Sequence, residues 1–505
     1  MCNHKSHEDE PLFSSISISV TTKEKGREYR EKTEDAAAWP SPREVVEELR
    51  SLGGIAGPMV MTSLLLYSRS VISMLFLGHL GETELAGASL SMGFANITGY
   101  SVISGLALGM EPICGQAYGA KRCSLLSLAL QRTFLLLLIA TIPISILWLN
   151  MEPILLWLGQ DHTITGIAST FIAFSLPDLL AQAFLQPLRI FLRTQNLIKP
   201  LIHGATFALI LHIPTNYFLV IYLKLGIRGV ALAASSGSFN MVFYLLAYLA
   251  FTKSALKPWE NLTRECLQGW KPLLYLSLPS AASVCLEWWW YELMIILCGL
   301  LSNPRASVAS MGILIQTTAL IYVFPSSISL AVSTRVGHEL GANQPDKARR
   351  ATVVAMVSGA MMGFLALLFT LSMSHFWAKM FTNDAEILLL TSITLPIVGL
   401  CELGNCPQTT GCGVLRGSAR PSIGANINLG SFYLIGMPVS ILMGFGFKLG
   451  FVGLWLGLAA AQGSCVALML YTVFNTDWKC QAKRAKLLIA EDGVANDLEA
   501  TLLVH

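Results

Sequence analysis

The sequence contains twelve long apolar segments, and the connections between them are short and carry much of the charge. A helix needs about 20 apolar residues to cross the roughly 30 Å hydrocarbon core of a bilayer, and each segment reaches that length. The predicted fold is therefore an all-α membrane protein with twelve transmembrane helices. The apolar segments lie at residues 52–77, 88–110, 125–149, 163–186, 201–222, 229–251, 272–299, 307–331, 352–375, 386–411, 423–445 and 451–474.

The composition favours a membrane protein with many spans over a soluble enzyme with one anchor. Of the 505 residues, 53% are apolar and 13% are charged, against about 25% charged in soluble domains. The net charge is +3, and no basic stripe with interleaved aromatic residues occurs, so we expect no nucleic-acid partner. Residues 1–45 and 475–505 are predicted to be polar tails, the first of them disordered, and 42–50 a short helix along the membrane surface.

Positive charge is unevenly divided between the two sides of the predicted membrane. The connections that follow even-numbered segments, and the C-terminal tail, hold most of the Lys and Arg residues outside the N-terminal tail, among them Lys121, Lys253, Arg350 and Lys483. Cytoplasmic connections of membrane proteins are enriched in Lys and Arg. We therefore expect both termini in the cytoplasm, together with the connection at 252–271.

The two halves of the sequence resemble each other. Pro58 aligns with Pro279, and the segment Gly-Gln-Ala-Tyr-Gly-Ala at 115–120 aligns with Gly-His-Glu-Leu-Gly-Ala at 337–342. Such matches continue along each half at offsets of about 219–224 positions. A match of this length indicates an internal repeat.

Each repeat contains six apolar segments, so both repeats enter the membrane from the same side and are related by a pseudo-two-fold axis along the membrane normal. We predict an N-lobe at 46–251, a cytoplasmic linker at 252–271 and a C-lobe at 272–474. Two lobes with a cleft between them are typical of transporters that alternate access by rocking. A static scaffold is the alternative explanation of the repeat.

The segment at 279–300 is almost wholly apolar, yet it contains Glu287, Glu292 and three consecutive tryptophans. An ionised side chain at the centre of a spanning helix costs about 2.5–3.5 kcal/mol, so such residues usually face water, a partner or a proton and serve a function. A carboxyl that only fixes helix packing is the alternative. No Walker A motif, catalytic constellation or metal-ligand spacing occurs, so we predict no enzyme, no cofactor, no metal and no use of ATP.

Five motifs carry a resemblance to a known family. They are Gly-His-Leu-Gly at 78–81, Glu-Pro-Ile-Cys-Gly-Gln-Ala-Tyr-Gly-Ala at 111–120, Pro-Ser-Ala-Ala with Cys-Leu-Glu-Trp-Trp-Trp-Tyr-Glu at 279–292, Ser-Thr-Arg-Val-Gly-His-Glu-Leu-Gly-Ala at 333–342, and Gly-Val-Leu-Arg-Gly at 413–417. On these motifs, residues 45–475 resemble the multidrug and toxic compound extrusion (MATE) family, specifically its plant branch.

The resemblance implies a monomeric antiporter in the plasma membrane or in a vacuolar or endosomal membrane. An organic solute would leave the cytosol while a proton, or in some members Na⁺, enters it. The implied solutes are cations, alkaloids, flavonoids, organic acids or hormones, as in multidrug and xenobiotic efflux. The residues leave three alternatives open: an exporter of organic anions or hormone-like metabolites, a lipid-flippase-like protein, and a membrane scaffold that does not transport.

The resemblance also implies roles for residues in the seventh segment. Glu287 and Glu292 match the family's Leu-Glu-Trp-Trp-x-x-Glu signature, and being five residues apart they point about 140° apart around a helix. We expect Glu287 to carry the proton, with Tyr291 one turn later hydrogen-bonding it. Glu292 is expected to be a second site or a structural acceptor, and Trp288 to stack on a planar or cationic substrate.

Two positions depart from the family pattern. Many relatives have an Asp eleven residues before the Arg of the Arg-Gly motif, whereas Arg416 is preceded at that distance by Asn405, which cannot titrate. Glu402, one turn earlier, would replace it in proton coupling and leave Asn405 to contact substrate. Arg69 lies well inside the first segment near Tyr67, and we expect both to contact substrate, Arg69 through an anionic group. Pairing of Arg69 with a carboxylate and snorkelling to the membrane surface are the alternatives.

Overall fold

The structure is a computed structural model that describes residues 39–252, 256 and 264–490. All regular elements in these ranges are helices, and twelve of the helical stretches there are long and apolar enough to span a membrane. The predicted all-α membrane fold is therefore confirmed. Most of the predicted N-terminal tail, half of the linker at 252–271 and the last part of the C-terminal tail lie outside the described residues.

The N-terminal half contains six of these spans, and the second and fifth include a π-helical turn. Its elements are α2 (Pro42–Leu80), α3 (Glu82–Ala95), η1 (Asn96–Tyr100), α4 (Ser101–Leu108), α5 (Met110–Gly119), α6 (Cys123–Leu149), α7 (Met151–Trp157), α8 (His162–Thr194), α9 (Lys199–Asn216), η2 (Tyr217–Tyr222) and α10 (Ile227–Phe251).

The C-terminal half contains the other six spans and ends on one more helix, α18. Its elements are η3 (Arg264–Leu267), α11 (Lys271–Gly299), α12 (Pro304–Gly341), α13 (Pro345–Met373), η4 (Trp377–Met380), α14 (Ala385–Gly417), α15 (Pro421–Asn428), η5 (Leu429–Gly436), α16 (Met437–Ile441), η6 (Leu442–Gly446), α17 (Gly450–Phe474) and α18 (Trp478–Ile489).

Two sequence predictions at the ends of the chain need correction. Residues 42–50 do not form a separate surface helix, because α2 runs without a break from Pro42 to Leu80. The polar C-terminal tail contains the helix α18, which the apolar pattern did not reveal. Asp477 caps α18 by accepting hydrogen bonds from the backbone N–H groups of Lys479 (2.9 Å) and Cys480 (3.1 Å).

Equivalent sequence signals start equivalent helices in the two halves. Asp161 and Asp384, which the repeat places at matching positions, cap α8 and α14 with their side chains. Pro200 and Pro421 likewise stand at the start of α9 and α15, where a missing backbone N–H carries no penalty. Equivalent helices of the two repeats therefore begin with the same kinds of capping and N-terminal residues.

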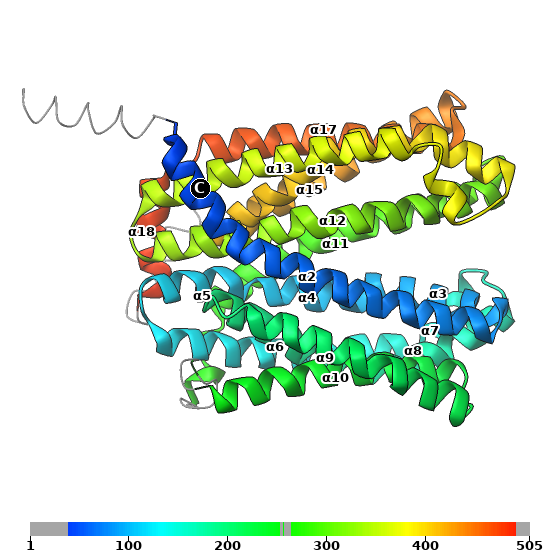
Figure 1. Ribbon diagram of the computed structural model, residues 1–505, viewed down its shortest axis with the longest axis horizontal. Coiled ribbons are helices and arrows are strands. Elements are labelled where there is room, and N and C mark those ends of the chain that lie inside the picture. The colour runs from blue at the N-terminus through cyan, green and yellow to red at the C-terminus, as the bar shows by residue number, and fades with distance from the viewer. Residues whose placement is uncertain (1–38, 253–255, 257–263, 491–505) are drawn as a thin grey trace, which may run out of the picture. The chain divides into compact units, whose positions relative to one another are not determined.

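The helices form two lobes that correspond to the two repeats (Figure 1). In Figure 1 the N-terminal helices, blue to green, form one group and the C-terminal helices, green to red, form the other. The lobes meet where α4 packs against α11 and where α5 packs against α12. We call this contact region the seam.

Glycines at matching repeat positions allow the two backbones to approach at the seam. A Cβ atom built on Gly115 would lie 3.4 Å from Cα of Gly337, and one built on Gly337 would lie 3.2 Å from Cα of Gly115. Farther along, a Cβ on Gly119 would overlap the carbonyl oxygen of His338, and one on Gly341 would overlap that of Gln116. Small residues four apart are typical of close helix contacts in membranes.

Hydrogen bonds across the seam follow the same symmetry. Gln116 donates from Nε2 to the carbonyl oxygen of Gly417 at 3.1 Å, and His338 Nε2 lies 2.8 Å from the carbonyl oxygen of Thr194. Gln116 and His338 are equivalent in the repeat, as are Thr194 and Gly417. The α5–α12 part of the seam is therefore a pseudo-two-fold contact between the C-terminal ends of two even-numbered spans.

We predict that Gly119→Ala destabilises the folded protein, because the added methyl group overlaps the His338 backbone and overpacking of this kind costs about 1–3 kcal/mol. Gly312→Ala is the matched control, since nothing lies within 4 Å of a Cβ at that position. Thermal unfolding of both variants in detergent, followed by tryptophan fluorescence, measures the effect. Equal melting temperatures for the two variants would show that the seam does not require close backbone contact.

Candidate functional site

Polar side chains within the spans gather in three places. The first lies at the seam, around Glu111. The second lies inside the C-lobe, around Glu287 and Glu402. The third lies inside the N-lobe, around Arg69.

Glu111 on α5 is held by two arginines that come from different lobes. Arg193 on α8 donates from Nη2 to Glu111 Oε1 at 2.6 Å, and both side chains are buried. Arg416 on α14 places Nε 3.4 Å from Glu111 Oε2, which is ion-pair distance without hydrogen-bond geometry. Arg193 and Arg416 occupy equivalent positions in the repeat. One carboxylate thus joins the two lobes through two symmetry-related cations.

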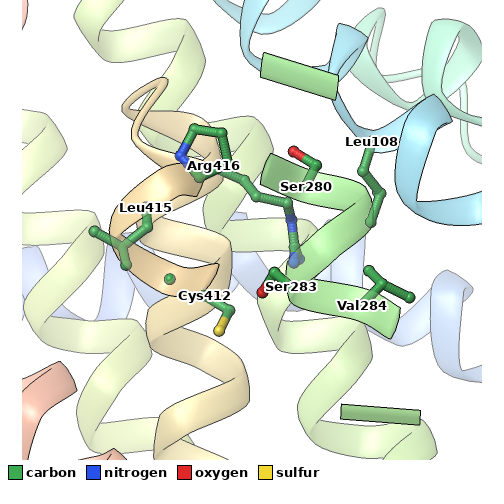
Figure 2. A pocket seen from close by; sticks show the side chains of 9 residues that line it. Leu108, Ser280, Ser283, Val284, Cys412, Leu415 and Arg416 are labelled. Carbon is green, nitrogen blue, oxygen red and sulfur yellow. The ribbon is translucent and has the colours of Figure 1, made fainter. Parts of the chain in front are cut away.

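Arg416 also borders a small pocket at the seam (Figure 2). Leu108 of the N-lobe lines one side of this pocket, and Ser280 and Ser283 of α11 line another. Figure 2 shows the Arg416 side chain extending from its own helix toward these two serines. Its Nη2 donates to Ser329 Oγ on α12 at 2.8 Å. The guanidinium therefore connects α14, α12 and the N-lobe.

Glu402 on α14 is almost completely buried, with 1% of its surface exposed. Its Oε2 accepts a hydrogen bond from Asn405 Nδ2 at 2.9 Å. Asn405 Oδ1 in turn accepts from Thr409 Oγ1 at 3.3 Å and from Gln462 Nε2 at 3.4 Å. Neutral donors thus surround this carboxyl, and no Lys or Arg within the described ranges pairs with it.

Glu287 on α11 lies near Glu402 and is half-buried, so it keeps some exposure. Its charge interacts with that of Glu402 on one side and with that of Arg416 on another. Tyr291 and Tyr322 interact electrostatically with both carboxyls. No hydrogen bond joins Glu287 to Tyr291 among the described residues, so the two residues share a helix face without the predicted contact.

A chain of amides extends this polar region to the seam pocket. Gln408 on α14 donates from Nε2 to Asn428 Oδ1 on α15 at 3.2 Å, and Asn428 Nδ2 donates to Ser283 Oγ at 3.1 Å. Gln408 and Asn428 are both fully buried. Sequence analysis did not identify them, although amides in the middle of apolar segments would have been the signal.

Glu292 and the tryptophans of α11 lie on other faces of the helix. Glu292 approaches α3 of the N-lobe, 3.7 Å from where a Cβ of Gly93 would stand, and so faces the opposite lobe. Trp288 and Trp289 are 37% and 38% exposed, and Trp289 donates from Nε1 to the Ile97 carbonyl oxygen at 2.9 Å. Trp290 is buried inside the C-lobe. Of the three rings, Trp288 is therefore the one that is exposed and makes no hydrogen bond to the N-lobe within the described ranges.

Tyr67 and Arg69 on α2 face in different directions. Tyr67 donates from its hydroxyl to Gln316 Oε1 on α12 at 3.0 Å, which connects the two lobes. Arg69 extends into the N-lobe and donates from Nη1 to Ser238 Oγ on α10 at 3.2 Å. Among the described residues no carboxylate lies within ion-pair distance of Arg69. The alternative prediction, that Arg69 pairs with a carboxylate, therefore has no support in these residues.

The structure brings Glu287, Glu402, Asn405 and Tyr291 together in the C-lobe and leaves Glu292 outside that group. It places Arg69 in the N-lobe, away from the acids. The contact of Glu111 with Arg416 could not be predicted from the sequence, because only the folded chain brings α5 and α14 together.

Comparisons with known proteins agree with this architecture. The family model described as MatE matches residues 58–218 and again 279–442, so the two matches begin at the prolines that align in the repeat. Protein DETOXIFICATION 48 of Arabidopsis thaliana is 56% identical over 97% of this chain and 94% of its own length. Protein DETOXIFICATION 49 of the same plant is 58% identical over 90% of this chain and 91% of its own length.

A solved structure is similar as well. The crystal structure of the eukaryotic MATE transporter AtDTX14 superposes with a TM-score of 0.84 at 33% sequence identity. The match covers 88% of this chain and 99% of the other.

We predict that Glu111→Gln destabilises the protein by about 3–5 kcal/mol, because the substitution leaves Arg193 without its carboxylate in a buried place. Glu82→Gln is the control, since Glu82 is exposed in the first turn of α3. Thermal unfolding of the two variants measures the difference. A Glu111→Gln melting temperature no lower than that of the control would contradict the role of this ion cluster.

Proposed function

Because the chain belongs to the MatE family, it is a multi-pass membrane transporter and not an enzyme, and we propose that it exports organic solutes from the cytosol in exchange for protons. The name DETOXIFICATION that its relatives carry agrees with efflux of such compounds. The exported solutes would be organic cations, alkaloids, flavonoids, organic acids or hormones.

The observation that carries the proton-coupling proposal is the pair formed by Glu287 and Glu402. The two carboxyls interact electrostatically inside a membrane-spanning lobe, and Glu402 has only neutral hydrogen-bond donors. Two negative charges in a poorly hydrated space repel each other, so such a pair is most stable when it holds a proton. A group of this kind can take up a proton on one side of the membrane and release it on the other.

Arg416 couples the charge of this proton site to the contact at the seam. Its guanidinium interacts with Glu287 and with Glu111. When Glu287 is ionised, it competes with Glu111 for Arg416 and weakens the contact between the lobes. When Glu287 is protonated, Arg416 is left to Glu111 and the seam is strengthened. The proton thereby biases one lobe arrangement over the other, which is what antiport requires.

The direction of transport follows from the proposed orientation. The positive-inside pattern places both termini and the even-numbered connections in the cytoplasm. The seam lies at the C-terminal ends of even-numbered spans, so it would close the cytoplasmic side in the state described here. Protonation from outside would then release the solute outward, and loss of the proton to the cytosol would reopen the cytoplasmic side.

Trp288 and Tyr67 fit a solute path between the lobes, because Trp288 offers an exposed ring and Tyr67 reaches α12 across the boundary. Asn405 is buried, with 2% of its surface exposed, so in this state it joins the proton site to the surrounding amides and does not reach the solute. Glu292 faces the N-lobe and would serve as a second acceptor on that path. We propose that the protein works as a monomer in the plasma membrane or in a vacuolar or endosomal membrane.

The proposal predicts that Glu287→Gln abolishes proton-coupled transport and that Glu402→Gln lowers its rate at least about tenfold, because a carboxamide cannot carry a proton. Purified protein is reconstituted in liposomes with a trapped pH dye, a pH gradient is imposed, and a panel of organic cations and carboxylates is added. Solute-dependent proton movement is the readout, and Glu82→Gln is the control. Unchanged proton movement in Glu287→Gln would refute the coupling mechanism.

A further inference from the structure

Two arginines inside the N-lobe, Arg69 on α2 and Arg189 on α8, have no role in the proton mechanism. Both are half-buried within spans. Arg69 donates to the Ser238 hydroxyl, and Arg189 makes no hydrogen bond within the described ranges. No carboxylate in those ranges lies within ion-pair distance of either guanidinium. A charged group in such a place usually belongs to a functional site and has a partner.

The two arginines belong to one polar stripe. Asp178, Gln182, Gln186 and Arg189 follow one another at helical spacing and share a face of α8. Gln186 donates to Gln182 at 3.2 Å, and Gln182 donates to the Ser238 hydroxyl at 3.3 Å.

The Ser238 hydroxyl is also the acceptor for Arg69, so Arg69 joins the stripe through it. The charges of Arg69 and Arg189 interact with each other. The stripe therefore presents hydrogen-bond donors between two cations.

The nearby groups do not neutralise this positive charge. Asp178 accepts a hydrogen bond from the Tyr100 hydroxyl at 2.7 Å, and its other carboxylate oxygen has no hydrogen-bond partner. His212 lies beside Gly237, as Arg69 does, and its Nε2 lies 3.0 Å from the Asn216 amide nitrogen and 2.9 Å from the Ser73 hydroxyl, so it offers no negative charge. Asp178 thus lies in the same stripe and pairs directly with neither arginine.

We propose that Arg69 and Arg189 bind the anionic group of the exported solute, an organic carboxylate. A guanidinium presents a planar fork of N–H donors that matches a carboxylate, and such pairs are stronger and more directional than neutral hydrogen bonds. The two lobes then have different functions. The acids of the C-lobe bind the proton, and the arginines of the N-lobe bind the carboxylate at a distance from those acids. This inference rests on the proposed export function and assigns a substrate class to it.

The test measures binding rather than transport. The full-length protein in lipid nanodiscs is melted in the presence of benzoate, 1-naphthoate or indole-3-acetate, and of the carboxamide of each. We expect carboxylates to raise the melting temperature more than their uncharged carboxamides do. Arg69→Gln and Arg189→Gln should each weaken the apparent affinity at least about tenfold, the usual effect of removing a hydrogen bond to a charged group.

Two controls keep the result specific to the site. Arg228→Gln removes the same charge from an exposed position at the start of α10 and should leave carboxylate binding unchanged. Arg69→Lys keeps the charge but loses the planar fork, so binding should be weaker than in the wild type and stronger than in Arg69→Gln.

A wild-type protein that does not distinguish any carboxylate from its carboxamide would overturn the inference, and this outcome does not depend on the folding of any variant. Carboxylate binding that survives in both Arg69→Gln and Arg189→Gln would overturn it as well. The melting assay requires no proton gradient, so failure of this inference there and failure of proton coupling in the liposome assay are separate results.

Discussion

The structure depends on how ionisable side chains are accommodated where water is scarce. Each lobe contains charged residues within its spans, and each charge must find a partner, a proton or a ligand. Glu111 is satisfied by Arg193 of its own lobe and approached by Arg416 of the other. Glu402 is surrounded by neutral amides and lies near a second acid. Arg69 donates a hydrogen bond to the Ser238 hydroxyl, and no carboxylate among the described residues pairs with it. We propose one role for each environment: holding the lobes together, carrying a proton and receiving an anion.

Duplication of one six-helix unit explains the geometry of the seam. Because Gly119 and Gly341 are equivalent, the two helices that carry them approach each other in a nearly symmetrical way, and at both positions a Cβ would overlap a backbone carbonyl oxygen of the other helix. At the seam the two repeats differ in the chemistry of their side chains rather than in the path of their backbones. One repeat supplies the carboxylate Glu111, whereas the other has Ser333 at the corresponding position. A single acid therefore serves two equivalent arginines, and Arg416 is free to respond to Glu287 as well.

Much of the fold could be predicted from the sequence, because apolar length, Lys and Arg distribution and the internal repeat are local or periodic signals. Twelve spans and two lobes follow from them, and helical spacing alone separates the directions of Glu287 and Glu292. Contacts between distant helices could not be predicted in the same way. Glu111 and Arg416 lie far apart in the sequence, and the spacing of Glu287 and Tyr291 specifies a shared face but no side-chain contact. The helix α18 was missed because its polar sequence carries no span signal.

The central claim is that the proton on Glu287 controls the seam through Arg416. The most direct measurement is the distance across the seam between spin labels at Lys121, after α5, and Asn343, after α12, in lipid nanodiscs at pH values from 5 to 8. The account predicts a short and a long distance, with the short one gaining population as the pH falls, and a Glu287→Gln protein that holds the short distance at every pH. A single distance at all pH values, or the same pH response in Glu287→Gln, would contradict it.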